Sequence, residues 1–103
     1  MRILNDVERA WVGAALDTDG SVYLQRHKYR SGIQRMYWRI DFSSTEVELI
    51  SAFLRLVGAG KVHGWRSGSG GQMWSLRINR QDDVKALLEQ LIGFSVKAYE
   101  YCN

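Results

Sequence analysis

The chain carries, at residues 10–20, the stretch AWVGAALDTDG, from which the rest can be interpreted. Seven apolar residues run into Asp17-Thr18-Asp19-Gly20, and glycine is a common helix stop. Acids are unfavourable at a helix C-terminus, because that end carries partial negative charge. Two acids there indicate a divalent-cation site, since carboxylates and free carbonyls are ligands for Mg²⁺ or Ca²⁺. The alternative is an ordinary solvated turn.

The same stretch predicts a helix over residues 6–18. Asn5 is a good N-cap, and Glu8 three residues later completes a capping-box pattern. A helix that is apolar on every side must be buried on every side, and 103 residues form one modest core. We therefore expect one face of the helix to pack on a second copy of the chain, with a buried helix of a monomer as the alternative. The expected dimer contacts are Trp11, Val12, Gly13, Ala14, Leu16 and Asp17.

Composition limits the class of protein. The only cysteine is Cys102, so we expect no intrachain disulfide and a reducing compartment. No stretch predicts a membrane span or a signal peptide, and the expected location is intracellular, in a prokaryotic cytoplasm or an organelle. His27 and His63 are isolated, which argues against a zinc site. We expect a single domain over residues 1–103.

The basic residues gather in two segments. Residues 20–43 and 58–80 together hold nine Lys and Arg against one acid, while the rest holds five basic and ten acidic residues. A charge split of this kind, +8 against −5, is typical of a surface that binds a polyanion.

These basic segments also show the alternation of strands. The pattern predicts strands at 21–27, 36–43, 61–66 and 72–79, joined in pairs by hairpin loops at 28–35 and 67–71. A second capping box at 45–48 predicts a helix to about residue 57, ended by Gly58-Ala59-Gly60. A third helix begins near Asp82 with apolar residues Val84, Leu87, Leu88, Leu91 and Ile92, and residues 94–103 are left open between a tail and a short final helix.

The resulting order is αββαββα, which predicts an α+β fold with a four-stranded antiparallel sheet and helices on one face. Trp38, Phe42, Trp74 and Leu76 are expected to face the helices. The other face is basic, aromatic and hydrogen-bonding, and Arg and Gln pair with guanine and adenine edges in the major groove, where a β-ribbon fits. A solvated sheet face would normally mix charges of both signs. The expected DNA-binding residues, with those of the adjoining loops, are Tyr23, Gln25, His27, Lys28, Arg30, Tyr37, Arg39, Asp41, Lys61, His63, Trp65, Arg66, Ser75 and Arg77.

Residues 12–20, VGAALDTDG, resemble the motif of the LAGLIDADG homing endonucleases. The Asp-x-Asp-Gly end matches in full, and the preceding positions match as small or apolar types. The resemblance extends over nearly the whole chain, because αββαββα is that family's order of elements. The segment 58–62 resembles the family's glycine turn into the third strand.

The resemblance implies a DNA-cleaving enzyme. With one motif, the chain resembles the members that form homodimers and cut long palindromic or near-palindromic double-stranded sites in intron or intein homing. By position, Asp19 is the implied metal ligand and catalytic acid, with the Thr18 carbonyl as an additional ligand. Asp17 falls on the motif's first acid, which is not usually a ligand. The implied cofactor is Mg²⁺, with Mn²⁺ or Ca²⁺ as substitutes that support binding.

Two positions depart from the family's pattern. Many members carry Gln at the end of the second strand, where this chain has Ser43 and Ser44, and Ser43 is the expected catalytic equivalent. Lys97 is the candidate for the family's basic active-site residue, with an exposed tail lysine as the alternative. The alternative functions are a non-cleaving DNA-binding regulator, an intron maturase, which alone would require RNA, and a structural dimer. The presence of Asp19 argues against the regulator, and the absence of a second basic patch argues against the maturase.

Overall fold

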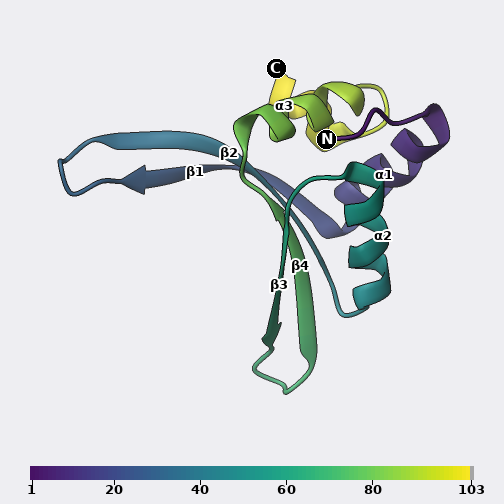
Figure 1. Cartoon of the computed structure of the whole chain (residues 1–103), viewed down its shortest axis with the longest axis horizontal. Coiled ribbons are helices and arrows are strands. Elements are labelled where there is room, and N and C mark those ends of the chain that lie inside the picture. The colour runs from purple at the N-terminus through teal and green to yellow at the C-terminus, as the bar shows by residue number, and fades with distance from the viewer. Residues whose placement is uncertain (103) are drawn as a thin grey trace.

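The computed structural model describes residues 1–102, and Asn103, the last residue of the expected domain, lies outside them. The elements are α1 (Asp6–Asp19), β1 (Gly20–Lys28), β2 (Gln34–Ser44), α2 (Val47–Val57), β3 (Lys61–Arg66), β4 (Gln72–Ile78), α3 (Gln81–Gln90) and α4 (Val96–Cys102) (Figure 1). The predicted order is confirmed, and the open C-terminal segment contains a short helix.

The four strands form one antiparallel sheet in the order β1-β2-β4-β3. Pairing between β1 and β2 runs without a break from Gly20–Phe42 to Lys28–Gln34. β4 pairs only with the second half of β2, from Ile40 to Ser44. The outer half of the β1–β2 hairpin therefore leaves the sheet as an arm, and the β3–β4 hairpin diverges from it (Figure 1).

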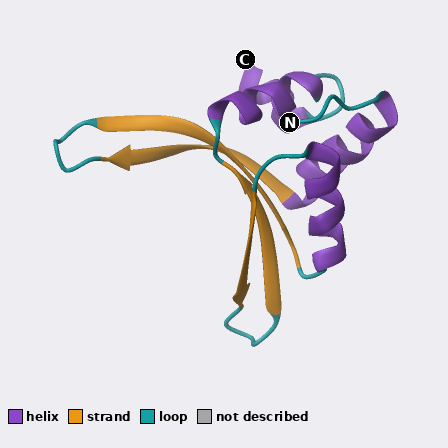
Figure 2. Cartoon of the chain, viewed as in Figure 1, coloured by secondary structure: helices purple, strands orange, loops and turns teal. Residues whose placement is uncertain are grey.

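The helices pack together on one face of the sheet, as predicted (Figure 2). Phe42 of β2 stacks on Phe53 of α2 with ring centroids 4.5 Å apart. Complete burial of such a side chain contributes about 1.5–3 kcal/mol. The core is completed mainly by fully buried aliphatic residues from the sheet and all four helices: Val12, Leu16, Ile40, Ile50, Val57, Leu76, Ile78, Val84, Leu87, Leu88, Leu91 and Ala98.

The helix ends agree with the sequence for α1 but not for α2. The Asn5–Glu8 capping box is present in both directions. The capping box predicted at residues 45–48 is wrong, because Glu46 occupies the N-cap without a side-chain cap. Instead, Ser44 Oγ accepts a hydrogen bond from the Glu46 N–H at 3.0 Å. The predicted end of α2 is confirmed: Gly58 adopts the left-handed conformation, with φ at +71°, that glycine takes without strain.

α3 begins where β4 leaves β2. Gln81 bonds both the N–H and the C=O of Trp38 through its side-chain amide, at 2.9 and 2.8 Å. It thus satisfies backbone groups of β2 that β4 does not reach. The prediction that Ile92 belongs to the apolar stripe is wrong, because α3 ends at Gln90 and Ile92 is 46% exposed. None of the helices in residues 1–102 is long and apolar enough to span a membrane.

Candidate nucleic-acid interface and active site

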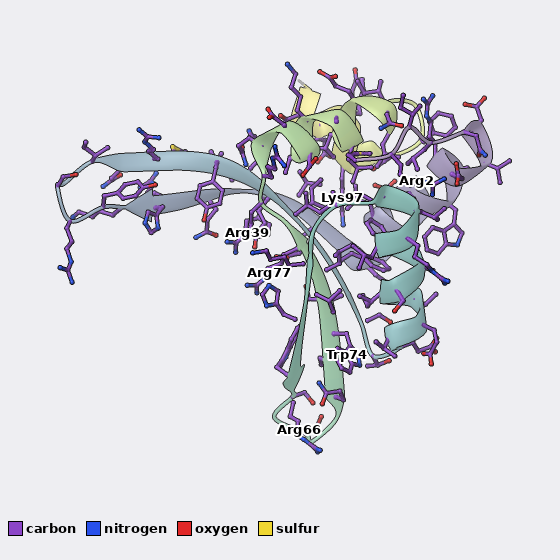
Figure 3. The ribbon with its side chains drawn as sticks, viewed as in Figure 1. Arg2, Arg39, Arg66, Trp74, Arg77 and Lys97 are labelled. Carbon is purple, nitrogen blue, oxygen red and sulfur yellow. The ribbon has the colours of Figure 1, made fainter. Side chains whose placement is uncertain are left out.

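The strand register brings most of the predicted DNA-binding residues onto one sheet face. Directly paired residues point to the same side of a sheet. Across β1 and β2 the pairs are His27–Arg35, Gln25–Tyr37 and Tyr23–Arg39. Across β2, β4 and β3 the rows are Asp41–Arg77–Lys61 and Ser43–Ser75–His63. Figure 3 shows Arg39 and Arg77 in the angle between the two hairpins, away from the helices.

Three members of the predicted set do not lie on the exposed part of this face, and their contact with DNA stays a prediction. Ser75 is only 2% exposed, so it is too buried to contact DNA in this conformation. Lys28 pairs with Gln34 and Arg66 with Gln72, and these pairs lie on the helix-facing side, at the bases of the hairpin loops. Arg30 lies in the β1–β2 loop. The sequence reasoning missed Arg35, which the same two-residue alternation would have included had the second strand been started earlier.

A hydrogen-bonded cluster lies at the centre of this face. The Tyr23 hydroxyl donates to Asp41 Oδ2 at 2.6 Å, and Arg77 Nε donates to Asp41 Oδ1 at 3.2 Å. The guanidinium of Arg39 lies 5.9 Å from the ring centroids of both Tyr23 and Tyr37. Its Nε donates to Asn79 Oδ1 at 2.6 Å, a contact that sequence reasoning also missed.

Two groups of the cluster, Tyr23 and Arg39, have raised pKa values. Burial and the hydrogen bond to Asp41 raise the pKa of Tyr23, so its hydroxyl keeps its proton. The hydrogen bond with Tyr23 raises the pKa of Arg39 against the opposing effect of burial, so its charge is retained. Asp41, the acid on this face, is therefore bonded by both Tyr23 and Arg77.

The end of α1 presents the second predicted site. Asp19 is the last residue of the helix and is exposed, and its carboxylate has no hydrogen-bond or ion-pair partner within residues 1–102. Thr18 is also exposed, and its hydroxyl turns back to donate to the Ala14 carbonyl at 2.9 Å. α1 passes directly into β1 at Gly20, so Asp19 lies beside the first residue pair of the sheet.

Asp17 and Lys97 connect this helix end to α4. The Asp17 carboxylate accepts hydrogen bonds from Ser95 Oγ at 2.7 Å and from the N–H groups of Val96 and Lys97 at 3.0 and 3.2 Å. Burial raises the pKa of Asp17, but these hydrogen bonds and the Lys97 charge outweigh it and leave the pKa below its ordinary value. In return, Lys97 Nζ donates to the carbonyls of Leu16 and Gly20. The two residues therefore clamp the chain on both sides of Asp19.

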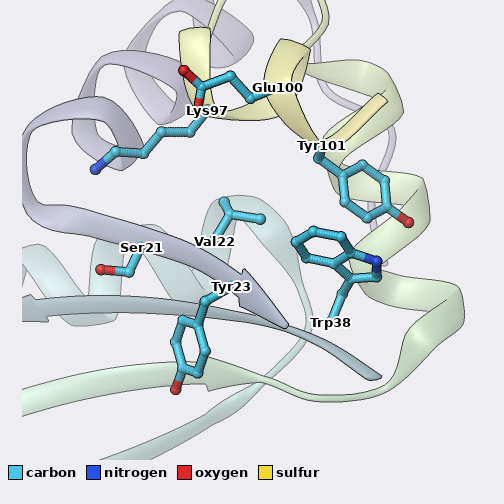
Figure 4. A pocket seen from close by; sticks show the side chains of 7 residues that line it. All are labelled: Ser21, Val22, Tyr23, Trp38, Lys97, Glu100 and Tyr101. Atoms are coloured by element: carbon cyan, nitrogen blue, oxygen red, sulfur yellow. The ribbon is translucent and has the colours of Figure 1, made fainter. Parts of the chain in front are cut away.

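A cavity of about 490 Å³ lies between β1 and α4, and Lys97 contributes to its wall. It is also lined by Ser21, Val22, Tyr23, Trp38, Glu100 and Tyr101 (Figure 4). Trp38 and Tyr101 close one side by an edge-to-face contact at 4.8 Å. Lys97 thus lies at the helix end as predicted but is already bonded to backbone carbonyls, and its catalytic role stays a prediction. Ser43, partly exposed on β2, also stays a prediction.

The oxygen groups at the end of α1 fit a hard cation. Within residues 1–102 there is no group of three His, Cys, Asp or Glu side chains that could hold a metal. Mg²⁺, however, is commonly bound by one or two carboxylates together with waters and substrate phosphates. A free carboxylate at Asp19 next to helix-end carbonyls is a donor set of that kind. Zinc, which takes four Cys, His or carboxylate ligands in structural sites, does not fit.

The exposed apolar surface of α1 includes fewer residues than the predicted dimer contact. Val12 and Leu16 are fully buried, and a Cβ on Gly13 would lie 2.3 Å from the Phe94 carbonyl oxygen. These three residues pack within their own chain, and Asp17 also bonds within it, so their contact with a second copy stays a prediction. The exposed stripe consists of Val7, Ala10, Trp11 and Ala14.

No protein-family model and no curated protein matches this chain. Solved structures do match. The homing endonuclease I-CvuI, solved with DNA in the presence of Mg, matches with a TM-score of 0.75 and 16% identity over 90% of this chain and 62% of its own. The archaeal intron-encoded homing endonuclease I-Vdi141I, complexed with DNA, matches with a TM-score of 0.71 and 12% identity over 86% of this chain and 56% of its own. The LAGLIDADG meganuclease I-CpaMI, bound to uncleaved DNA, matches with a TM-score of 0.69 and 16% identity over 92% of this chain and 34% of its own.

The chain therefore spans between one third and two thirds of the length of these proteins. The matches cover between 86% and 92% of this chain. At this level of identity the likeness establishes the architecture, in agreement with the motif at residues 12–20. The chain has the fold of the LAGLIDADG homing endonucleases.

Proposed function

We propose that the chain is one domain, residues 1–103, of a homodimeric, divalent-metal-dependent endonuclease that makes a double-strand cut at a long palindromic or near-palindromic DNA site. The observation that carries the proposal is the free Asp19 carboxylate at the end of α1, beside a sheet face whose one acid is neutralised. A carboxylate without a protein partner next to a phosphate-binding surface is unfavourable unless a cation joins the two. Intron or intein homing is the biological role that this activity serves.

Each group at the site has a specific task. The sheet face holds the duplex and places a scissile phosphate near the end of α1. Asp19 and the Thr18 carbonyl would hold Mg²⁺, which supplies Lewis-acid chemistry: it activates water and neutralises charge at the leaving oxygen. The clamp of Asp17 and Lys97 keeps the Asp19 backbone in place while phosphate charge approaches. A dimer supplies two such acids, one for each strand.

Binding to duplex DNA should depend steeply on salt. Phosphate contacts release counterions, and for six or more contacts affinity falls roughly 10³-fold between about 50 and 200 mM salt. Fluorescence anisotropy with a labelled duplex in Ca²⁺ measures this slope without cutting. Cleavage of a site selected from a randomised library in Mg²⁺ then tests the enzyme. Specific binding without cutting would favour the non-cleaving regulator, and salt-independent binding would contradict the proposed interface.

Replacing Ala14 with Glu should turn the dimer into a monomer. Ala14 lies in the exposed apolar stripe of α1, where a charge at a helix-to-helix contact would be buried without a partner. Sedimentation velocity at micromolar concentration should show the wild type at twice the monomer mass and the variant at the monomer mass. Ser51→Glu, an exposed change of equal charge on α2, is the control and should remain a dimer. A monomeric wild type would contradict the homodimer.

A further inference from the structure

The two arginines at the centre of the sheet face are bonded in different ways. Both come from neighbouring strands and both lie in the angle between the hairpins (Figure 3). Their charge alone would give them the same role toward DNA. Their hydrogen bonds give them different roles.

Arg39 is committed to the protein. Its Nε donates to Asn79 at 2.6 Å, its NH1 to the Tyr23 hydroxyl at 3.3 Å and its NH2 to the Tyr37 hydroxyl at 3.4 Å. Each nitrogen of its guanidinium therefore has a partner within the sheet. Three of its five N–H donors are used in this way, so a bidentate approach to a base edge would compete with bonds that hold two aromatic side chains.

Arg77 is held at one nitrogen only. Nε donates to Asp41 at 3.2 Å, and its two terminal nitrogens have no partner within residues 1–102. The Arg77 side chain is 40% exposed, whereas Asp41 is 18% exposed and is itself fixed by the Tyr23 hydroxyl. The carboxylate thus sits behind the guanidinium and leaves its outer edge facing solvent.

A guanidinium held in this way is suited to one base. Guanine presents two acceptors, O6 and N7, side by side in the major groove, and a bidentate arginine is the commonest specific contact to them. Holding the side chain beforehand reduces the rotamer freedom lost on binding. The Asp41 carboxylate also holds Nε of Arg77 by a charge-assisted hydrogen bond, which disfavours movement of the guanidinium toward a phosphate.

We propose that Arg77, positioned by Asp41, reads a guanine at one fixed position in each half-site, and that Arg39 reads no base. Asp41 is a positioning residue: it sets which base Arg77 prefers more than how tightly the protein binds. This assignment rests on the proposed DNA binding of the sheet face.

The test is selection of randomised duplex DNA in Ca²⁺, without cutting, followed by anisotropy on the selected site and its single-base variants. The wild type should show one guanine per half-site whose replacement costs about tenfold or more in affinity. Arg77→Lys keeps the charge but loses the planar pair of donors, so it should reduce that preference severalfold while keeping the salt dependence. Asp41→Asn should reduce the preference at the same position severalfold while affinity for mixed-sequence DNA holds or rises.

Two further variants keep the result interpretable. Arg39→Lys should leave the guanine preference in place, and Arg55→Lys, on the exposed side of α2, should change nothing. Thermal melting of each variant confirms that it is folded. If folded Arg77→Lys or Asp41→Asn keeps the full preference, or if Arg39→Lys abolishes it, the assignment is overturned. If the wild type binds no duplex, the proposed function itself fails, which is a separate outcome.

Discussion

Replacing Asp19 with Asn should abolish cleavage while the protein still folds and binds DNA. Asn has nearly the same size but no charge to hold a divalent cation. Loss of metal assistance removes several kcal/mol of transition-state stabilisation, which corresponds to roughly 10³-fold or more in rate. Single-turnover cleavage of the selected site in Mg²⁺ measures the rate, and anisotropy in Ca²⁺ measures binding. Binding should be equal or tighter, because a carboxylate near phosphate is repulsive when no metal is present.

Asp17→Asn is the matched control, because it removes the same charge two residues earlier. Asp17 bonds Ser95, Val96 and Lys97, so this variant should lower the melting temperature and retain most of the cleavage rate. Since the pKa of Asp17 is lowered in the folded state, its contribution is present above the ordinary carboxyl range and is lost as pH falls through the lowered pKa. The melting difference from wild type should shrink accordingly in acid. An Asp19→Asn variant that cuts at a near wild-type rate would show that the metal site lies elsewhere.

Replacing Gly13 with Ala should destabilise the fold. The added Cβ would lie 2.3 Å from the carbonyl oxygen of Phe94 and 2.9 Å from its carbonyl carbon, so α1 and the α3–α4 connection must separate. Such overpacking costs about 1–3 kcal/mol, occasionally more, which lowers the melting temperature of a domain this size by about 4–8 °C per kcal/mol.

Gly68→Ala serves as the control for this prediction. A Cβ at Gly68 meets nothing within 4 Å, and this variant should melt within a degree or so of the wild type. Urea denaturation gives the free energy of unfolding for each. Equal stability of Gly13→Ala and wild type would mean that α1 does not pack on the Phe94 backbone in solution.

Much of this architecture follows from local pattern. Two-residue alternation placed Tyr23, Arg39 and Arg77 on one face, and the register confirms it because pairing preserves faces. The capping box at Asn5 was predictable because both of its partners lie within four residues. The start of α2 was not predictable in this way. The hydroxyl that bonds the N-cap residue Glu46 belongs to Ser44, at the end of a strand, and not to Thr45.

The contacts around α1 could not be predicted from its own sequence. Asp17 and Lys97 each lie about 80 residues along the chain from the groups that they bond, and no periodicity connects such distant positions. For the same reason Gly13 suggested close approach to a second copy, although its actual neighbour is Phe94. The different roles of Arg39 and Arg77 likewise depend on Asn79 and Asp41, which only the sheet register brings beside them.

The direct passage from α1 into β1 makes chain length at this junction a determinant of which side chains the proposed DNA-binding face presents. No loop separates Asp19 from Gly20, so there is no slack to absorb an added or lost residue. A single insertion at this junction would turn Tyr23, Gln25 and His27 toward the helices and Val22 and Leu24 toward solvent. Insertions and deletions that leave this face unchanged are therefore expected at the two hairpin tips, where the strands end, and not at the junction of α1 and β1.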